Sequence, residues 1–172
     1  ILSLPGAPFL HYSGGQLHLE GVRLADLAAQ HGTPLFSYSK ASILAALAAY
    51  QKGLAGRKAL ICYALKANSH LAILQVLAKA GCGFDTVSKG EIMRALKAGA
   101  APEKIVFSGV GKTRAEMHYA LEVGIHCFNV ESIAELHVLS EVAAGMGKTA
   151  PISIRVNPNV DAKTHPYIST GL

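Results

Sequence analysis

The sequence predicts an α/β fold built on a parallel sheet, and three observations support that prediction. Apolar segments typical of buried strands begin near residues 59, 83, 105, 127 and 151. Their spacing of about 22 to 25 residues fits one strand plus one helix with short connections. Three predicted helices end at a glycine just before the next strand, in VLAKAG (76–81), ALKAG (95–99) and ALEVG (120–124). The spacing of a helix capping box recurs at Ser88–Glu91, Thr113–Glu116 and Ser132–Glu135.

The first part of the chain has a different pattern, that of a β-hairpin. Residues 9–12 and 17–19 flank the Gly14–Gly15 pair, which favours a tight turn between two strands. His11 and His18 lie on these predicted strands. A metal bound between them is the alternative, but no third ligand is evident, so we interpret both as sheet-surface residues.

Two helices and one strand are expected between the hairpin and the first repeat. A helix over residues 24–30 stops before Pro34, because proline cannot continue it. Residues 35–38 are expected to form a short strand. Ser39 then caps a helix rich in alanine and leucine that ends at Gly53.

The stretch ALICYALKANSH, residues 59–70, contains the strongest candidate for chemistry. The apolar run from Ala59 to Leu65 predicts a strand buried on both faces, and it stops at Lys66. Ligands of α/β folds bind at the carboxyl ends of strands, so Lys66 is a candidate nucleophilic amine. From position alone, the simpler interpretation is that Lys66 marks where the strand reaches water.

Polar residues follow the other predicted strands, and in a barrel all of them face one mouth. They are Ser108, Gly109, Asn129, Glu131 and Asn157, together with Asp85 and Arg155. A charge that interrupts an apolar strand is costly unless it is paired, so we expect Lys66, Asp85 and Arg155 to form one charged cluster. The acid would fix the lysine, and the arginine would bind an anionic or phenolic oxygen. The alternative is an ion-pair network that only specifies packing; three charges on separate strands favour function.

The repeat permits an open sheet or a closed (β/α)8 barrel, and the failure of nucleotide motifs favours the barrel. GCGFDT (81–86) has Thr86 in place of the third glycine of GxGxxG. FSGVGKT (107–113) and GMGKT (145–149) lack the first glycine of a phosphate-binding loop. A barrel needs eight strands, of which the repeat provides five. Since the sequence ends at Leu172, we expect an incomplete barrel.

Composition and charge exclude several classes of function. The 172 residues are 51% hydrophobic and carry a net charge of +5 without a basic run, which argues against nucleic-acid binding. Apolar runs stay below the roughly 18 residues of a membrane span, and the first residues show no charged region followed by an apolar signal core, so we expect a cytoplasmic protein. Cys62, Cys82 and Cys127 are expected to be buried free thiols.

Six segments occur in the order in which one enzyme family presents them. They are YALKAN, GFDTVSKGE, FSGVGKT, FNVES, IRVNP and DAKTHPYISTG. The chain thereby resembles the N-terminal portion of the diaminopimelate decarboxylases, a branch of the alanine-racemase-like, fold type III, pyridoxal-phosphate-dependent decarboxylases. His70 stands where that family often has asparagine.

The resemblance implies a pyridoxal-phosphate-binding (β/α)8 TIM-like barrel and a second β domain. Residues 1–22 would be a β segment of that second domain, and residues 23–172 would be the incomplete barrel, with about its first five βα units. Lys66 would form the Schiff base with pyridoxal 5′-phosphate, and Asp85 and Arg155 would lie close to the cofactor. The further candidates for cofactor contact are Asn68, Glu91, Asn129 and His165.

The function implied by the resemblance is decarboxylation of meso-2,6-diaminopimelate to L-lysine and carbon dioxide, the last step of lysine biosynthesis. A cytoplasmic homodimer with shared active sites is expected, without a metal, nucleic acid or membrane partner. The family's phosphate loop, acid/base partners and substrate-binding arginines lie later in the chain, so residues 1–172 alone are expected to be inactive. The alternatives are a decarboxylase of ornithine, arginine or a polyamine precursor, a non-catalytic barrel that carries the cofactor, and a scaffold without a ligand.

Overall fold

The computed structural model describes residues 4–160 and residue 163. Contacts between residues divide the chain into two compact units, residues 1–59 and residues 60–172, and each is described by itself. The domain boundary predicted after residue 22 falls inside strand β3 (Val22–Arg23), and the assignment of residues 1–22 to a second domain stays a prediction.

The first unit begins with the predicted hairpin. Strands β1 (Leu10–Ser13) and β2 (Gln16–Leu19) pair antiparallel, and β3 adds to β2. Gly14 and Gly15 have φ angles of 56° and 74°, the left-handed conformation that a two-residue hairpin turn requires. His11 and His18 face each other across the strands, with ring centroids 5.8 Å apart. No group of three potential metal ligands gathers within the described residues.

Two helices complete this unit. They are α1 (Leu24–His31) and α2 (Lys40–Gly53). Ser39 caps α2 as predicted, accepting from the amide of Ser42, and its hydroxyl donates to the Glu20 carboxylate at 2.6 Å. That hydrogen bond lowers the pKa of Glu20. The predicted strand at residues 35–38 is wrong: the segment is irregular, because a strand needs a pairing partner and this one has none among the described residues of its unit.

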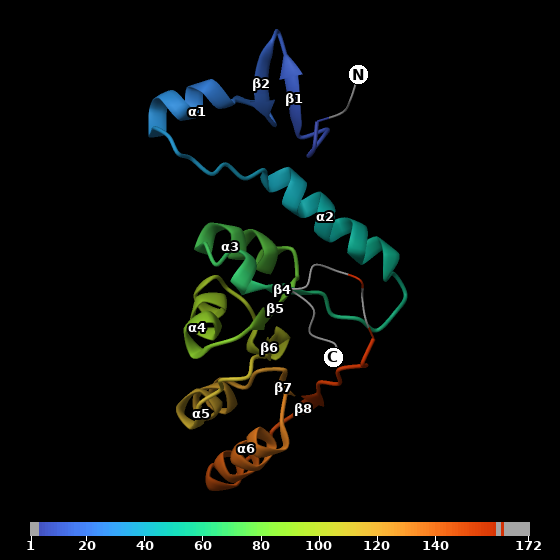
Figure 1. Cartoon of the computed structure of the whole chain (residues 1–172), viewed down its shortest axis with the longest axis vertical. Coiled ribbons are helices and arrows are strands. Elements are labelled where there is room, and N and C mark those ends of the chain that lie inside the picture. Colours follow the sequence, from blue (N-terminus) through green and yellow to red (C-terminus); the bar gives the residue numbers. More distant parts are fainter. Residues whose placement is uncertain (1–3, 161–162, 164–172) are drawn as a thin grey trace. The chain divides into compact units, whose positions relative to one another are not determined.

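The second unit is a parallel sheet in the order β4-β5-β6-β7-β8, which confirms the predicted strand and helix repeat (Figure 1). The strands are β4 (Cys62–Ala64), β5 (Gly83–Thr86), β6 (Ile105–Phe107), β7 (Cys127–Val130) and β8 (Ile152–Ile154). The helices are α3 (Leu71–Lys79), α4 (Lys89–Lys97), α5 (Arg114–Val123) and α6 (Ile133–Gly145). Short 3₁₀ turns η1 (Leu65–Ala67) and η2 (Pro102–Lys104) precede α3 and β6.

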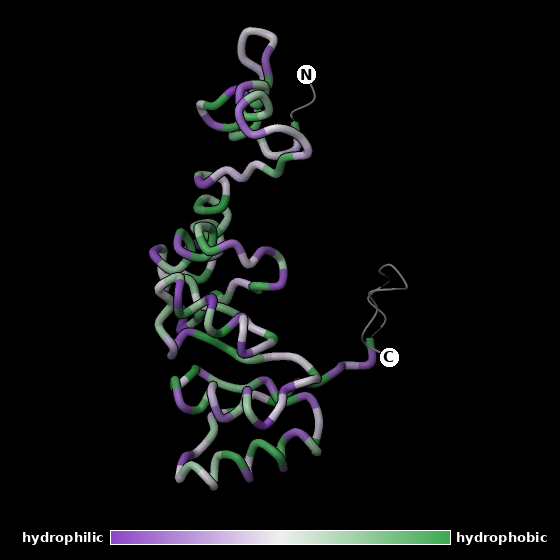
Figure 2. Tube along the Cα trace, turned by 90° about the vertical axis from the view of Figure 1, so that its left-hand side faces the viewer, coloured by the Kyte–Doolittle hydropathy of each residue, from purple (hydrophilic) through white to green (hydrophobic). Residues whose placement is uncertain are grey.

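The two faces of this sheet differ in burial. Strand register aligns Thr86, Phe107 and Phe128 on the face toward the helices, and all three are fully buried. The helices α3 to α6 lie along this face (Figure 1), and hydrophobic and hydrophilic residues alternate along them (Figure 2). The opposite face carries Asp85 and Asn129, which are only partly buried. The core of this unit therefore lies between the sheet and the helices.

The apolar run at residues 59–65 was expected to be one strand buried on both faces, and this prediction is wrong in extent and burial. Only Cys62–Ala64 form β4, with intermediate exposure, and Leu60 is 39% exposed. The physical reason is that β4 is an edge strand of the described sheet and helices cover only one of its faces. Lys66 nevertheless follows the strand directly, as predicted, in η1.

The predicted capping boxes begin helices as expected, but only one is reciprocal. Thr113 and Glu116 each bond the other's backbone amide at the start of α5. Glu91 at the start of α4 instead accepts from the amide of Val87, one residue before the cap. The Glu135 carboxylate likewise accepts from Glu131 at the start of α6. Sequence spacing therefore identified the helix starts, and the carboxylates also fix the preceding strand ends.

The prediction of three buried free thiols is correct for Cys82 and wrong in burial for Cys62 and Cys127. Cys62, Cys82 and Cys127 are free; Cys82 is buried and the other two are partly buried. Across residues 4–160, no helix has the length and apolar character needed to cross a bilayer.

Candidate active site

Lys66 lies at the carboxyl end of β4, in a turn that is held by hydrogen bonds between its neighbours and not by the Lys66 amine. The neighbouring Leu65 is fully buried and anchors the turn. The Tyr63 hydroxyl donates to the Asn68 carbonyl at 3.3 Å, and Asn68 Oδ1 accepts from the His70 amide at 3.0 Å. Lys66 itself is exposed and forms no hydrogen bond or ion pair with any residue in the described part of the chain. The amine is thus positioned by the fold and available for a ligand.

Asp85, Ser108 and Asn129 form a chain of hydrogen bonds, which we call the Asp85 network. Ser108 Oγ donates to Asp85 Oδ1 at 2.5 Å and accepts from Asn129 Nδ2 at 2.8 Å. These residues come from β5, the turn after β6, and β7, so the network joins three neighbouring strands. Asp85 pairs in register with Ala64, two residues before Lys66. The network thus fixes a carboxylate on the strand next to the lysine.

A second group, the Lys112 cluster, comprises the Lys112 ammonium, the Glu135 carboxylate and the carbonyls of Gly109 and Asn129. Lys112 Nζ lies 2.7 Å from Gly109 O, 2.8 Å from Asn129 O and 2.7 Å from Glu135 Oε1. Its side chain is 0% exposed, so all three ammonium donors are used inside the protein. This lysine has no donor left for a ligand.

Glu131 connects the turn after β6 with the end of β8. Its Oε1 accepts from the Gly109 amide at 2.6 Å, and its Oε2 accepts from Arg155 Nη1 at 3.0 Å. The Glu131 side chain is 7% exposed, whereas that of Arg155 is 48% exposed. One side of the Arg155 guanidinium is therefore fixed, and the rest is accessible to an anion.

The structure brings Lys66, Asp85 and Arg155 to one edge of the sheet but does not pair them. The ion pairs within residues 4–160 join Arg155 to Glu131 and none of the three to another, so the predicted direct cluster is wrong. The physical reason is that Asp85 accepts from Ser108 and Arg155 donates to Glu131 instead.

The further candidates divide into two groups. Asn129 belongs to the Asp85 network, on the same face as Asp85. Asn68 and Glu91 accept from backbone amides at the starts of α3 and α4, which is a structural role. His165 lies outside the described residues.

Cys62 lies on β4 below Lys66, and its environment argues against a thiol nucleophile. Burial, followed by the neighbouring Cys82 and Asp85, raises the pKa of the Cys62 thiol from an ordinary 9.0 to about 11. A protonated thiol is a poor nucleophile. Lys66 is therefore the nucleophilic candidate of this edge.

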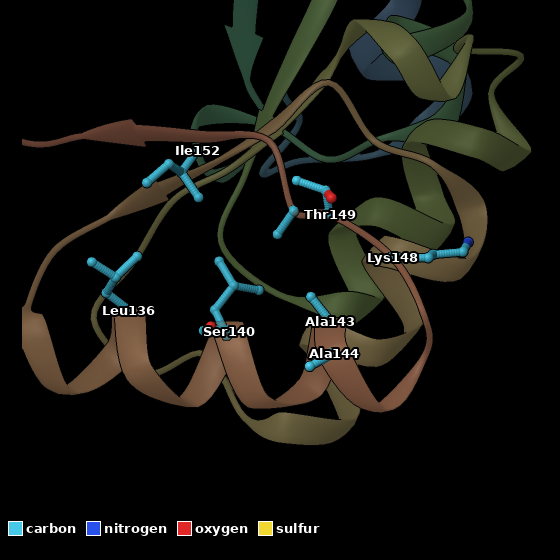
Figure 3. Close-up of a pocket in the computed structure, with 9 residues that line it drawn as sticks. Leu136, Ser140, Ala143, Ala144, Lys148, Thr149 and Ile152 are labelled. Carbon is cyan, nitrogen blue, oxygen red and sulfur yellow. The ribbon is translucent and has the colours of Figure 1, made fainter.

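A cavity elsewhere in this unit does not belong to the site. It lies between α6 and β8 and is lined by Leu136, Ser140, Ala143 and Ile152, among others (Figure 3). Ile152 pairs in register with Phe128, whose side chain faces the helices. The cavity therefore opens on the helix side of the sheet, away from Asp85 and Asn129.

Lys112 and Glu135 are the site-supporting residues that sequence reasoning missed. As a motif, FSGVGKT resembles only an incomplete phosphate-binding loop, and the spacing of Glu135 from Ser132 predicts only a helix cap. The available signal was a lysine within a glycine-rich turn directly after a buried strand, together with the polar strand ends of FSG and FNVE.

Comparisons with known proteins identify the family and the fold of this chain. The family model described as "Pyridoxal-dependent decarboxylase, pyridoxal binding domain" matches residues 40–172. The diaminopimelate decarboxylase of Pseudomonas aeruginosa is 58% identical over 94% of this chain, and that of Vibrio cholerae is 57% identical over 95%. The chain spans 39% of the length of each of these relatives.

Solved structures show the same fold. The diaminopimelate decarboxylase from Helicobacter pylori complexed with L-lysine has a TM-score of 0.84 and 54% identity over 87% of this chain and 38% of that chain. A lysine/ornithine decarboxylase from Vibrio vulnificus has a TM-score of 0.70 over 83% of this chain and 36% of that chain. At 21% identity, the latter shows the fold alone. On its sequence and its fold, the chain belongs to the pyridoxal-dependent decarboxylase family, whose model matches residues 40–172.

Proposed function

We propose that this chain supplies the covalent cofactor anchor, Lys66, of a decarboxylase that converts meso-2,6-diaminopimelate to L-lysine and carbon dioxide. The observation that carries the proposal is the Lys66 amine, positioned at a strand end and left without a partner in the described residues. The substrate is inferred from the diaminopimelate decarboxylases, which are 57–58% identical to this chain in two species.

The residues at this edge fit pyridoxal 5′-phosphate by their chemistry. An unpaired amine is the group that attaches an aldehyde cofactor. The exposed part of the Arg155 guanidinium can donate to an anionic or phenolic oxygen, since Glu131 engages only one of its nitrogens. When bound, the cofactor withdraws electrons from the substrate carbon that loses its carboxylate.

The residues of this chain would bind and orient the cofactor. Lys66 would hold the cofactor through Nζ. Asp85, with one oxygen fixed by Ser108, would place a negative charge on the strand beside that amine and favour its orientation. Arg155 would fix an oxygen of the ligand, and so limit its rotation at the carboxyl edge of the sheet.

Assembly and location extend the proposal. The resemblance to diaminopimelate decarboxylases supports a cytoplasmic homodimer with shared active sites, and it supports the assignment of residues 1–22 to a second β domain. Sedimentation of the longest natural protein that contains residues 1–172, called the full-length protein below, would test the dimer.

Release of carbon dioxide by the full-length protein tests the function. With added pyridoxal 5′-phosphate, we expect turnover of meso-diaminopimelate and not of ornithine, arginine or lysine. Turnover of ornithine or arginine instead would assign the related decarboxylases. Cofactor binding without turnover of any of these amino acids would contradict the enzymatic proposal and indicate a non-catalytic carrier.

A further inference from the structure

Lys112 is a charged group that the proposed reaction does not use. Its side chain is completely buried, and its three donors meet three acceptors at 2.7 to 2.8 Å. The ammonium also lies over the Phe107 ring, 5.6 Å from the centroid. Burying an ammonium is costly unless its donors are all bonded, and the three contacts of Lys112 meet that requirement.

Two of these acceptors are backbone carbonyls beside the Asp85 network. The Asn129 carbonyl belongs to the residue whose amide donates to Ser108. The Gly109 carbonyl belongs to the residue that follows Ser108. Lys112 therefore holds the backbone at Asn129 and at the residue next to Ser108, beside the two side chains on which the orientation of Asp85 depends.

Hydrogen bonds fix both the amide and the carbonyl of Gly109. Its carbonyl accepts from Lys112, and its amide donates to Glu131 at 2.6 Å. Its φ angle of 103° lies in the region that favours glycine, so the turn conformation depends on these contacts and on the absence of a side chain. A change in the Lys112 cluster would therefore alter the backbone conformation next to Ser108.

Glu135 completes the arrangement. One of its oxygens accepts from Lys112 and the other from the Glu131 amide, and its side chain is 9% exposed. The buried cation is thus matched by a buried anion, and the pair joins the turn after β6 to the start of α6. Removing one partner would leave the other charge buried and unpaired.

We infer that Lys112 is a positioning residue of the cofactor site: by holding the carbonyls of Gly109 and Asn129, it sets the Ser108 and Asn129 bonds that orient Asp85. This inference rests on the proposed function. It also excludes a phosphate contact by the lysine of GVGKT, because that ammonium is enclosed and fully bonded.

The test compares four variants of the full-length protein. K112M/E135M removes both members of the buried pair, so that no lone charge remains buried. S108A breaks the Asp85 network directly, and K112M/E135M/S108A combines the changes. K148M is the matched control, because Lys148 also donates to a backbone carbonyl, that of Leu121, but away from the site.

The first readout needs no cofactor. Amide hydrogen exchange of Gly109 is expected to rise roughly ten- to hundredfold in K112M/E135M, as a hydrogen bond to a charged group is lost from its turn, and to stay unchanged in K148M. Unchanged Gly109 exchange in a folded K112M/E135M protein would overturn the inference.

The second readout is the affinity for pyridoxal 5′-phosphate, with the absorbance spectrum of the bound cofactor. K112M/E135M and S108A are each expected to weaken binding, and the triple variant to be no weaker than S108A, because the lysine acts through Ser108. Additive losses would overturn the inference. If the unmodified protein binds no pyridoxal 5′-phosphate, the proposed function fails, and Gly109 exchange then decides the role of Lys112 in the turn.

Discussion

Lys66 and Lys112 both follow strands at the carboxyl edge of the same sheet, and they are opposite in environment. Lys112 is fully enclosed and bonded to two carbonyls and a carboxylate. Lys66 is exposed, and it has no partner among the described residues. The turn around Lys66 is held by other groups, such as the Tyr63 hydroxyl and the Asn68 side chain.

The partners of a strand-end lysine, rather than its position, determine its role. Three acceptors satisfy an ammonium completely and make it structural. A lysine whose neighbours are anchored while its amine is not is available for covalent chemistry. Each lysine therefore predicts a different consequence of its removal: loss of chemistry at Lys66 and loss of structure at Lys112.

The largest effect is expected for K66A in the full-length protein. It should lower kcat for diaminopimelate by about a thousandfold or more, the range found when a covalent catalyst is removed. The free energy of unfolding, measured by urea denaturation, should change by less than about 0.5 kcal/mol, because the Lys66 side chain is exposed. Substantial turnover by K66A, or a large loss of stability, would show that Lys66 was assigned wrongly.

K112M, unlike K66A, should lower the stability of the protein strongly. It leaves Glu135 as an unpaired buried charge, so the free energy of unfolding should fall by about 3 to 5 kcal/mol. K112M/E135M should recover most of this loss, since a buried ion pair can be replaced by apolar groups at little cost. Urea denaturation of both variants measures the difference; equal losses would contradict the ion-pair account.

Cys62 tests the environment below Lys66. Because the pKa of its thiol is raised to about 11, the thiolate fraction at pH 8 is about a hundredfold below that of an ordinary cysteine. Alkylation of Cys62 at pH 8, followed by peptide mass spectrometry, should be slower by about that factor. An alkylation rate equal to that of a cysteine in an unfolded peptide would mean that water reaches Cys62 and that its pKa is not raised.

The same shift has a defined sign for stability. A pKa raised on folding contributes stability that is present below the ordinary pKa of 9.0 and is lost as the pH rises through about 11. Unfolding followed between these pH values should show stability falling with pH, and a Cys62→Ser variant should lose that part of the slope.

The smallest effect separates the Lys112 cluster from the helix cap beside it. Thr113 caps α5 directly after Lys112, so T113A should cost about 1 kcal/mol, the usual value of a cap. If T113A costs as much as K112M, the start of α5, and not the buried ammonium, holds the turn after β6.

The sequence predicted the parallel repeat and the helix starts because both depend on local patterns. Strand spacing, glycines and caps are encoded within about 25 residues. The edge that gathers Lys66, Asp85 and Arg155 follows from parallel strands alone. Residues 35–38 were mispredicted because strand formation depends on a pairing partner, which a local pattern does not contain.

The hydrogen-bond partners of the charged residues could not be predicted from the sequence. Asp85 bonds Ser108, 23 positions away, and Arg155 bonds Glu131, 24 positions away. Such choices depend on strand register and on the reach of each side chain. Lys112 was missed for the same reason: two of its acceptors come from β7 and α6, and a motif search for phosphate loops does not look for them.

We propose that Lys66, and not Lys112, attaches the cofactor. The most direct measurement is reduction of the full-length protein with borohydride in the presence of pyridoxal 5′-phosphate, followed by peptide mass spectrometry. The account predicts the pyridoxyl group on Lys66 alone. Modification of Lys112, of another lysine, or of none would contradict it.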